Sequence, residues 1–271
     1  MDTQGPVIDV ARYGPWAVIA GGSEGVGAEF ASALAADGFN LVLIARKPGP
    51  LEDTADRCRG LGAEVRAIAL DLLDVDATSR IVEATSDVEV GLMIYNAGAS
   101  TCNERFLDAE LSEFGKVIDL NTTRMLELTQ HFGRRMVALS RGGIILVGSL
   151  SGYMGAERHS VYAGAKAFSR VFAESLWLEL REHHVDVLEL VLGVTRTPAM
   201  ERGGLNFDVP GLIVNDPAEV AREGLQRIAD GPVVVAGGNA EQAARSSGQD
   251  RAAVVLGAHE RIKRLTSRID R

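Results

Sequence analysis

The chain has 271 residues, in which 28 lysines and arginines stand against 37 aspartates and glutamates, giving a net charge of −9. Because the balance is acidic, the surface offers no overall basic face for a phosphate backbone, and nucleic-acid binding is not expected. No low-complexity segment or linker divides the sequence, so we predict one domain over residues 1–271 with a single large core.

The start of the chain and its cysteines suggest a cellular location. The segment MDTQGPVIDV lacks both a basic stretch and an apolar core, and no apolar run is long enough to cross a bilayer. Cys58 and Cys102 have neither metal-ligand spacing nor histidine partners, which fits a reducing compartment and argues against a zinc site. We therefore expect a soluble, cytoplasmic protein with no membrane partner and no metal.

Apolar runs and helical patterns alternate along the chain. Short apolar runs rich in β-branched residues predict strands over 16–20, 41–45, 65–70, 91–95, 143–147, 185–191 and 233–235. The segments between them predict helices over 28–37, 50–61, 75–85, 112–139, 161–182 and 217–229. Such alternation predicts an α/β fold in which a doubly wound, seven-stranded parallel sheet carries helices on both faces.

A glycine-rich turn follows the first predicted strand. Its glycines are Gly21, Gly25 and Gly27, a spacing that lets the backbone approach a pyrophosphate at the positive end of the following helix. The alternative is a tight turn at an ordinary strand–helix junction. The position directly after the first strand favours phosphate binding.

A hydroxyl, a phenol and an amine follow the fifth predicted strand. Ser149 lies just past its carboxyl end, where open α/β sheets bind ligands. Tyr162 and Lys166 are four residues apart in one predicted helix, so they share a face. A neighbouring cation moves the pKa of a phenol toward its ionised form by roughly one to three units, which makes Tyr162 a candidate acid or base. The alternative is a half-buried tyrosine beside a solvated lysine.

Taken together, these motifs resemble those of the short-chain dehydrogenase/reductase family from about residue 14 to residue 236. Ala20–Gly27 corresponds to the family's TGxxxGxG turn, Asp71 to its acidic adenine contact and Tyr95–Gly98 to its NNAG segment. The family's catalytic residues match, in the same order, Asn121, Ser149, Tyr162 and Lys166. The resemblance implies a Rossmann-type fold and an NAD(P)-dependent oxidoreductase that acts on CH–OH or C=O groups.

The resemblance also implies a role for each of these four residues. Tyr162 would donate a proton to a carbonyl oxygen in reduction and accept one in oxidation, and Ser149 would hold the substrate oxygen. Lys166 would lower the pKa of the phenol and bind the nicotinamide ribose, and Asn121 would position a water that connects Lys166 to solvent. The residues expected at the cofactor are Gly21, Ser23, Glu24, Gly25, Val26, Gly27, Arg46, Asp71, Leu72, Asn96, Ala97, Gly98, Tyr162, Lys166, Val194 and Thr197.

Three departures from the family pattern stand out. Ala20 replaces the usual threonine and Tyr95 the usual first asparagine, and each change removes a side chain that would brace the turn or a neighbouring strand. We expect the geometry to survive. Leu192-Gly193 replaces a Pro-Gly pair, so the nicotinamide side of the pocket is expected to be altered, although Thr197 still falls where the family contacts the nicotinamide amide.

The end of the second predicted strand bears on cofactor choice. An acidic residue there would bond to the adenosine ribose and repel a 2′-phosphate, whereas an arginine would pair with that phosphate. This chain has Ala45 and Arg46, which predicts NADP(H) in preference to NAD(H). The alternative is that Arg46 and Lys47 simply form a solvated turn. Glu24, in the glycine-rich turn, offers no further positive charge for a 2′-phosphate.

Other candidate catalytic residues are weaker. His183 and His184 are expected at the surface, where they suit the C-terminus of a helix. His159 lies three residues before Tyr162 and could touch a substrate, but a lone polar residue near a helix start is more often a cap or solvated. A hydrolase based on Ser149 is not expected, because no G-x-S-x-G motif surrounds it.

Residues 198–215 lack regular periodicity and contain glycines, so they suit a mobile lid over the pocket. The lid's apolar members are Met200, Leu205, Phe207, Leu212, Ile213 and Val214. They favour a hydrophobic substrate such as a steroid or an aromatic ketone, unless they simply pack on the body. The sequence is similar to hydroxysteroid-dehydrogenase-like and ketone-reducing branches of the family, which agrees with that substrate class.

A polar tail covers residues 238–271, and 251–271 has the pattern of an amphipathic helix that docks on its own subunit or on a partner. The family resemblance implies a homodimer or homotetramer. Two alternative functions are open: a 3-oxoacyl-thioester reductase, against which the acidic total argues mildly, and a non-catalytic NADP(H)-binding regulator, against which the complete set of catalytic residues argues.

Overall fold

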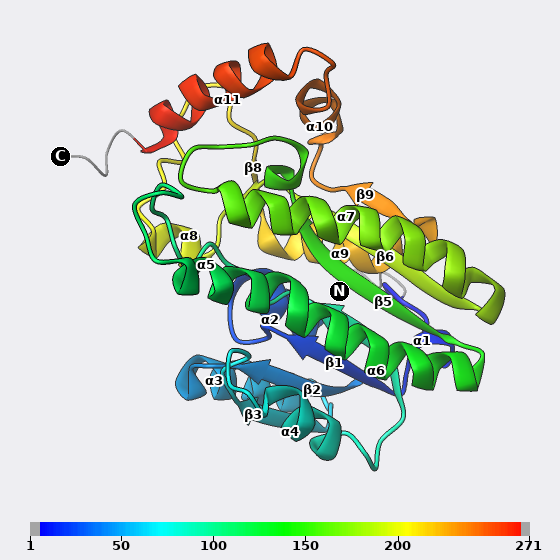
Figure 1. The fold of residues 1–271 in the computed structure, drawn as a ribbon. Helices are drawn as coiled ribbons and strands as arrows, with labels where there is room; N and C mark the ends of the chain where they lie inside the picture. Colours follow the sequence, from blue (N-terminus) through cyan, green and yellow to red (C-terminus); the bar gives the residue numbers. More distant parts are fainter. Residues whose placement is uncertain (1–5, 267–271) are drawn as a thin grey trace.

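The computed structural model describes residues 6–266 of the chain and contains a main sheet of seven parallel strands (Figure 1). The strands lie in the order β3-β2-β1-β4-β5-β6-β9. They are β1 (Trp16–Ala20), β2 (Asn40–Ala45), β3 (Val65–Ala69), β4 (Val90–Tyr95), β5 (Gly142–Ser149), β6 (Val185–Leu192) and β9 (Val233–Val235). The predicted fold class and all seven predicted strands are confirmed, with end shifts of one or two residues.

Helices cover both faces of this sheet. They are α1 (Val10–Tyr13), α2 (Gly25–Ala36), α3 (Pro48–Gly60), α4 (Ala77–Ala84), α5 (Leu111–Ile118), α6 (Arg124–Leu139), α7 (Ser160–Leu180), α8 (Pro198–Arg202), α9 (Pro217–Gln226), α10 (Ala240–Ser246) and α11 (Arg251–Thr266). Four short turns of helix complete the chain: η1 (Asp119–Thr123), η2 (Leu150–Tyr153), η3 (Arg181–His183) and η4 (Ile228–Asp230). Figure 1 shows α6 and α7 side by side across one face.

Two large apolar clusters hold the helices to the sheet. Side chains alternate along each strand, so Ile19 of β1 enters one cluster while Val18 enters the other. The first cluster packs α2, α3 and α9 on the sheet, and the second packs α4, α6 and α7. Phe30 and Phe132, one in each cluster, are fully buried, and each such side chain contributes about 1.5–3 kcal/mol.

The helix after the glycine-rich turn begins earlier than predicted. The sequence pattern suggested a start at residue 28, whereas α2 begins at Gly25. Glu24 has the extended backbone of an N-cap residue, so the last glycines of the turn are already in the first helical turn. The phosphate-binding segment and the helix N-terminus are therefore one continuous unit.

The long helix predicted over 112–139 is interrupted. A π-helical turn at Asp119–Thr123 separates α5 from α6. Within it, the side-chain amide of Asn121 donates to the carbonyl of Val117, four residues earlier, at 2.9 Å. This bond competes with the backbone ladder, which is how a short polar side chain perturbs a helix.

The predicted lid contains ordered structure that the sequence pattern did not indicate. Its start forms α8, and its end forms β8 (Val214–Asn215), which pairs in parallel with β7 (Val194–Thr195). Each of these strands has only two residues, which is too short for any period to be detected. The pairing anchors both ends of the segment just beyond the carboxyl end of β6.

The tail after residue 238 forms α10 and α11 in the part of the chain that the structure describes, and residues 267–271 of the predicted tail lie outside that part. Arg251, at the start of α11, donates to the carbonyls of Ser246 and of Tyr153 in η2, so this end of the tail docks on its own chain. Within residues 6–266, the search for a helix long and apolar enough to span a membrane found none.

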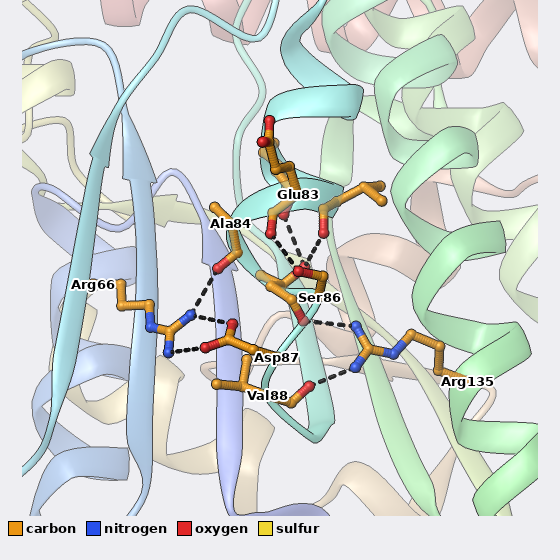
Figure 2. A network of polar contacts seen from close by, with 10 residues as sticks. Arg66, Glu83, Ala84, Ser86, Asp87, Val88 and Arg135 are labelled. Atoms are coloured by element: carbon orange, nitrogen blue, oxygen red, sulfur yellow. Dashed lines mark hydrogen bonds and ion pairs between the residues drawn. The ribbon is translucent and has the colours of Figure 1, made fainter.

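A polar network fixes the loop that leads from α4 into β4 (Figure 2). Arg66 of β3 binds both carboxylate oxygens of Asp87, at 2.6 and 2.9 Å, and the carbonyl of Ala84. Arg135 of α6 reaches the carbonyls of Thr85 and Val88 from the other side. The network secures the amino end of β4, at the opposite end of the strand from Tyr95.

Candidate active site

The candidate site lies where the carboxyl ends of β1, β4, β5 and β6 meet. The chain order reverses between β1 and β4, because β2 and β3 lie on one side of β1 and all later strands lie on the other. Ligands of open α/β sheets bind in the crevice at such a switch point. The glycine-rich turn and the four candidate catalytic residues described below are at this end of the sheet.

The glycine-rich turn is held close to the strands. Gly21 and Gly25 have φ angles of +86° and +56°, which favour glycine. A Cβ on Gly27 would lie 1.9 Å from the carbonyl oxygen of Gly21, so no side chain fits there. The first turn of α2 has no side-chain cap, which leaves backbone N–H groups directed out of the turn. This arrangement can accept the oxygens of a phosphate group.

The segment after β4 braces that turn. The side-chain amide of Asn96 donates to the carbonyl of Gly21 at 2.8 Å, and the backbone amides of Asn96 and Ala97 donate to the carbonyl of Ala20. The geometry of the turn therefore does not depend on a threonine at position 20. Gly98 continues this segment and is exposed.

The part of the site where the adenosine of a dinucleotide is expected holds the charged side chains of Arg46 and Asp71 and the buried side chain of Leu72. Arg46, just past β2, is largely exposed, and its guanidinium is 3.9 Å from the carboxylate of Asp71. Asp71 accepts a bond from the backbone of Leu73. The side chain of Leu72 is buried in the core, and its carbonyl accepts from Arg124, so only its backbone N–H remains for a ligand. Ser23 uses its carbonyl to accept from Thr54.

Three other predicted cofactor residues lie around the turn and the lid. Val26 is buried in the core at the start of α2. Val194 lies in β7. Thr197 caps α8 through its hydroxyl, and its methyl group would lie 3.0 Å from a Cβ on Gly25, so the start of the lid lies against the glycine-rich turn.

Glu24 is engaged by the lid. Both carboxylate oxygens of Glu24 accept bonds from the guanidinium of Arg202 in α8, one of them at 2.9 Å. This pair lowers the pKa of Glu24 below its usual range, since the hydrogen bond from Arg202 outweighs partial burial. Sequence reasoning did not single out Arg202. At Glu24, the backbone rather than the carboxylate is left to face a cofactor.

Tyr162 and Lys166 share one face of α7, as their spacing predicts. The Nζ atom of Lys166 lies 5.8 Å from the centroid of the Tyr162 ring. Lys166 is only 6% exposed, and its ammonium donates to the carbonyl of Val147 in β5 at 2.9 Å. Burial lowers the pKa of Lys166 from 10.5 to about 8, and the charge of Glu189 opposes this shift.

The pKa of Tyr162 moves in the opposite direction to the prediction. Burial raises it above the usual value of 10, and a side-chain hydrogen bond with Ser149 lowers it only in part. Desolvation of the phenolate therefore sets the direction of the shift, while the ammonium of Lys166 lies 5.8 Å from the ring centroid and bonds to Val147. The predicted lowering by Lys166 is wrong for the protein alone.

Ser149 ends β5 and begins η2. Its hydroxyl oxygen accepts a bond from the backbone N–H of Ser151 at 3.1 Å, which fixes the side chain at the carboxyl end of β5. The hydroxyl hydrogen is left to donate toward Tyr162 or toward a substrate oxygen beside it. Ser149 and Tyr162 thus present two hydroxyl groups to the same space.

Asn121, in the π-helical turn, lies close to Lys166. Its amide nitrogen donates to the carbonyls of Ala99 and Val117, whereas its Oδ1 atom is buried and has no hydrogen-bond partner. A Cβ on Gly98 would lie 2.8 Å from this Oδ1 atom and 3.0 Å from the Nζ atom of Lys166. Both polar atoms therefore face one small space beside Gly98. An acceptor left free there is suited to a bridging water.

Tyr95 also belongs to this site, although the sequence suggested only that it removes the bracing side chain of the family's asparagine. Its hydroxyl donates to the carbonyl of Leu120 at 2.5 Å, directly before Asn121. Tyr95 is 2% exposed, and burial raises the pKa of its phenol. The tyrosine therefore ties the end of β4 to the π-helical turn, in place of the side chain that the family pattern would provide.

We expect the Tyr95→Phe substitution to lower the free energy of unfolding by about 1–2 kcal/mol, because the buried carbonyl of Leu120 loses a partner. Urea denaturation of the variant and of the wild type measures this difference. Because the loosened turn carries Asn121, kcat should fall with it. Unchanged stability would show that the hydroxyl contributes nothing to the turn.

The histidines take the places that their positions suggest. The ring of His159 lies edge-on to that of Tyr162, with 6.4 Å between centroids, and its Nδ1 atom contacts the carbonyl of Glu157. His159 is thus at the rim of the site. His183 and His184 are exposed beyond the end of α7, as predicted. Among residues 6–260, whose side chains the structure describes, no three histidine, cysteine, aspartate or glutamate side chains are grouped so that they could hold a metal ion.

Comparison with known proteins assigns the family. The short chain dehydrogenase family model matches residues 15–204. A very-long-chain 3-oxoacyl-CoA reductase from Podospora anserina is 36% identical over 196 residues, covering 70% of this chain but only 57% of the reductase. A 7beta-hydroxysteroid dehydrogenase from Clostridium sardiniense is 27% identical over 89% of this chain and 92% of its own length.

A solved structure of a short-chain dehydrogenase has a similar fold. The short-chain dehydrogenase from Sphingobium yanoikuyae in complex with NADPH is 27% identical, covers 87% of this chain and 97% of its own, and superimposes with a TM-score of 0.75. The family match extends over more than half of the sequence and includes the turn, β5 and α7. The chain therefore belongs to the short-chain dehydrogenase/reductase family, whose members are dehydrogenases and reductases that act on CH–OH or C=O groups.

Proposed function

We propose that the protein is an NADP(H)-dependent oxidoreductase that interconverts a hydrophobic ketone and its secondary alcohol. The observation that carries this proposal is the meeting of Tyr162, Lys166, Ser149 and Asn121 at one crevice, next to a glycine-rich turn with no room for side chains. A phenol that can donate a proton, a hydroxyl that can hold the carbonyl oxygen and a nearby helix N-terminus that can hold a dinucleotide phosphate are the parts that carbonyl reduction needs from the protein.

The residues of the turn fit a dinucleotide. The positive φ angles at Gly21 and Gly25 and the lack of space at Gly27 let a pyrophosphate approach the backbone. Uncapped N–H groups at the start of α2 would hold its oxygens. When bound, NADP(H) supplies or accepts the hydride. In the proposal, Thr197 and Val194 border the nicotinamide end.

Proton transfer is assigned to Tyr162. In reduction, the phenol donates its proton to the carbonyl oxygen, and in oxidation the phenolate takes a proton from the alcohol. Ser149 donates its hydroxyl hydrogen to the same substrate oxygen and so fixes the carbonyl beside Tyr162. Lys166 places a positive charge near the phenolate as it forms, and Asn121 holds a water through its free Oδ1 atom to exchange the proton with solvent.

Burial keeps the phenol of Tyr162 protonated in the protein alone. Because burial raises the pKa of Tyr162, the phenol carries its proton at neutral pH before a substrate binds. That is the form that reduction requires. A protein in this state begins as a general acid, so reduction can start without a prior proton transfer to Tyr162.

Arg46 supports the preference for NADP(H). It is exposed at the end of β2, and its only ion pair among the described residues is the 3.9 Å contact with Asp71, so its guanidinium is available for a 2′-phosphate. The NADPH complex of the Sphingobium relative agrees with this choice.

The Arg46→Ser variant should lose this preference. We expect the Kd for NADPH to rise about 10- to 100-fold and the Kd for NADH to change little, because only the charge-assisted bonds to the 2′-phosphate are removed. Fluorescence titration of both nucleotides measures the ratio. Arg57→Ser, which removes an exposed arginine from α3, is the control. Equal weakening for both nucleotides would refute the assignment of Arg46 to the phosphate.

The substrate class rests on the lid and on the relatives. Met200 and Ile213 of the lid are 44% and 43% exposed, so they are available to an apolar ligand near the site. Phe207 instead packs under the guanidinium of Arg196. The relatives act on a hydroxysteroid and on a very-long-chain 3-oxoacyl thioester, both of which are large and apolar. We place ketosteroids and aromatic ketones first.

The 3-oxoacyl-thioester is the second candidate substrate, since the Podospora reductase is the more similar in sequence where it aligns. Loss of NADPH absorbance with purified protein separates the candidates when ketosteroids, aromatic ketones and acyl thioesters are compared. Turnover with a ketone supports the first proposal. Turnover with thioesters alone would replace it with the second, and tight NADPH binding without turnover would favour a regulator.

We also propose that the protein forms a homodimer or homotetramer through α7. Val171 and Leu178 on this helix are 53% and 61% exposed, and the rings of Phe168 and Phe172 stack on its surface. A row of apolar side chains of this kind is typical of a subunit interface. Sedimentation of the purified chain tests the proposal, and the mass of a single subunit would contradict it.

A further inference from the structure

One buried carboxyl group in the fold has no place in the mechanism above. Glu189 lies in β6, pairs in register with Leu146 of β5, and is 1% exposed. Its side chain occupies the space beside Gly148, where a Cβ would lie 2.6 Å from Oε1 of Glu189. The neighbouring positions on this face of the strand are apolar: Val185 and Val187 both belong to the core.

In its ionised form this carboxyl group does not stabilise the fold. Both of its oxygens are buried and lack a hydrogen bond. The neighbouring Ser169 lowers the pKa of Glu189 and so favours the charged form of that carboxyl group. Its hydroxyl, however, donates to the sulfur of Met125. Burying a carboxylate without full hydrogen bonding costs several kcal/mol, and an apolar side chain of similar size would avoid that cost. A structural role therefore does not explain Glu189.

Lys166 is the functional group that Glu189 can influence. The ammonium of Lys166 bonds to Val147, the residue directly before the Gly148 that makes room for the carboxyl group. Among the residues that the structure describes, no carboxylate lies within ion-pair distance of Lys166. Glu189 is the acidic group whose charge acts on Lys166, and Lys166 acts on Glu189 in return.

The other charges around Glu189 lie farther from the site. On α7 they are Arg170 and Glu174, which pair with each other at 3.6 Å, and on η2 the nearest titratable group is Tyr153, under the guanidinium of Arg170. The flanking strands β5 and β9 contain no titratable residue. The pair of Arg170 and Glu174 is nearly neutral overall, which leaves Lys166 as the main electrostatic partner of Glu189.

We propose that Glu189 is a positioning residue for the reaction: its buried carboxylate keeps Lys166 cationic, and Lys166 in turn supports the phenolate of Tyr162. This inference rests on the proposed function for its catalytic consequence, but not for the coupling between the two buried groups. An opposite charge in a buried setting shifts a titration by about one to three pH units. Without Glu189, burial alone would act on Lys166 and would remove its proton at lower pH.

The coupling can be measured without turnover. The lysines of the chain are Lys47, Lys116, Lys166 and Lys263, so lysine labelled with carbon-13 at Cε gives a simple NMR spectrum in which Lys166→Met assigns one signal. In Glu189→Gln, we expect the midpoint of the Lys166 titration to fall by at least about one pH unit below the wild-type value of about 8. An unchanged midpoint would overturn the proposal.

Glu174→Gln is the matched control, since it removes a carboxylate of α7 whose charge acts on Glu189 but is not among the charges that act on Lys166. Its Lys166 signal should titrate as in the wild type. Glu189→Asp keeps the charge and should retain part of the shift. If Glu174→Gln had the same effect as Glu189→Gln, the influence would be a general one of α7 and not that of Glu189.

Activity and stability then separate a positioning role from a structural one. If the midpoint falls by one unit, the cationic fraction of Lys166 at pH 8 drops from about one half to about one tenth, so kcat should fall about fivefold and the alkaline limb of its pH profile should move to lower pH. Stability should not fall. A large loss of stability in Glu189→Gln together with an unchanged pH profile would refute the positioning role.

The pH dependence of unfolding gives an independent check. Burial raises the pKa of Glu189 from 4.5 to about 7, so the folded state binds this proton more tightly than the unfolded state. The contribution of Glu189 to stability is therefore greatest below pH 4.5 and is lost as pH rises through about 7. In Glu189→Gln this decline should disappear. Its persistence in the variant would show that another group causes it.

Discussion

Replacing Tyr162 by phenylalanine should reduce kcat about 10³-fold while the Kd for NADPH changes only a few-fold. General acid catalysis by a positioned side chain contributes about 10²- to 10⁴-fold, and phenylalanine removes the proton while keeping the ring. The remaining contacts of α7, including the bond from Lys166 to Val147, do not involve the phenol oxygen. The fold and the dinucleotide site should therefore be unaffected.

Steady-state rates and NADPH titration of the variant measure these two quantities. The control is Tyr153→Phe, which changes a nearby tyrosine of η2 whose ring packs against Arg170 of α7. Tyr153→Phe should have a kcat within a few-fold of the wild type. If Tyr162→Phe also kept more than about a tenth of the wild-type kcat, another group would have to be the proton donor.

The second large effect is expected at the glycine-rich turn. In Gly27→Ala, the new Cβ would lie 1.9 Å from the carbonyl oxygen of Gly21 and 2.6 Å from the side-chain nitrogen of Asn96. Neither neighbour can move freely, because one is backbone and the other bonds to it. The turn must open, and the N–H groups at the start of α2 move away from the phosphate position.

We expect the Kd for NADPH to rise about 10²-fold in Gly27→Ala, since two or more charge-assisted bonds would be weakened. Forcing the atom into this space should also lower the free energy of unfolding by about 1–3 kcal/mol. Gly60→Ala is the control, because a Cβ at the end of α3 meets no atom within 4 Å. Wild-type affinity in Gly27→Ala would mean that the nucleotide does not lie on this turn.

The strands were predictable because each is a short apolar run bounded by glycine or polar residues. Every residue of β1 and β4 is buried, which is the pattern that an uninterrupted apolar run indicates. The ends of helices were less predictable. The start of α2 depends on the backbone of Glu24, and the break between α5 and α6 depends on one side-chain bond from Asn121. Neither changes the apolar period.

The positions of the candidate residues followed from spacing, but their surroundings did not. The four-residue spacing brought Tyr162 and Lys166 together. It could not show that burial would raise the pKa of the phenol, because burial depends on how η2 and β5 pack against α7. Glu189 was hidden for the same reason: within the predicted strand it is one of two charged residues in an apolar run, and only the fold places it near Lys166.

Transfer of deuterium tests the central proposal most directly. NADPH in which both hydrogens at C4 of the nicotinamide are deuterium is incubated with the purified protein and a ketosteroid or aromatic ketone, and the alcohol is analysed by mass spectrometry. The account predicts one deuterium on the carbinol carbon with the wild type, and about 10³-fold slower labelling with Tyr162→Phe. No label in any alcohol, from a protein that binds NADPH tightly, would contradict it.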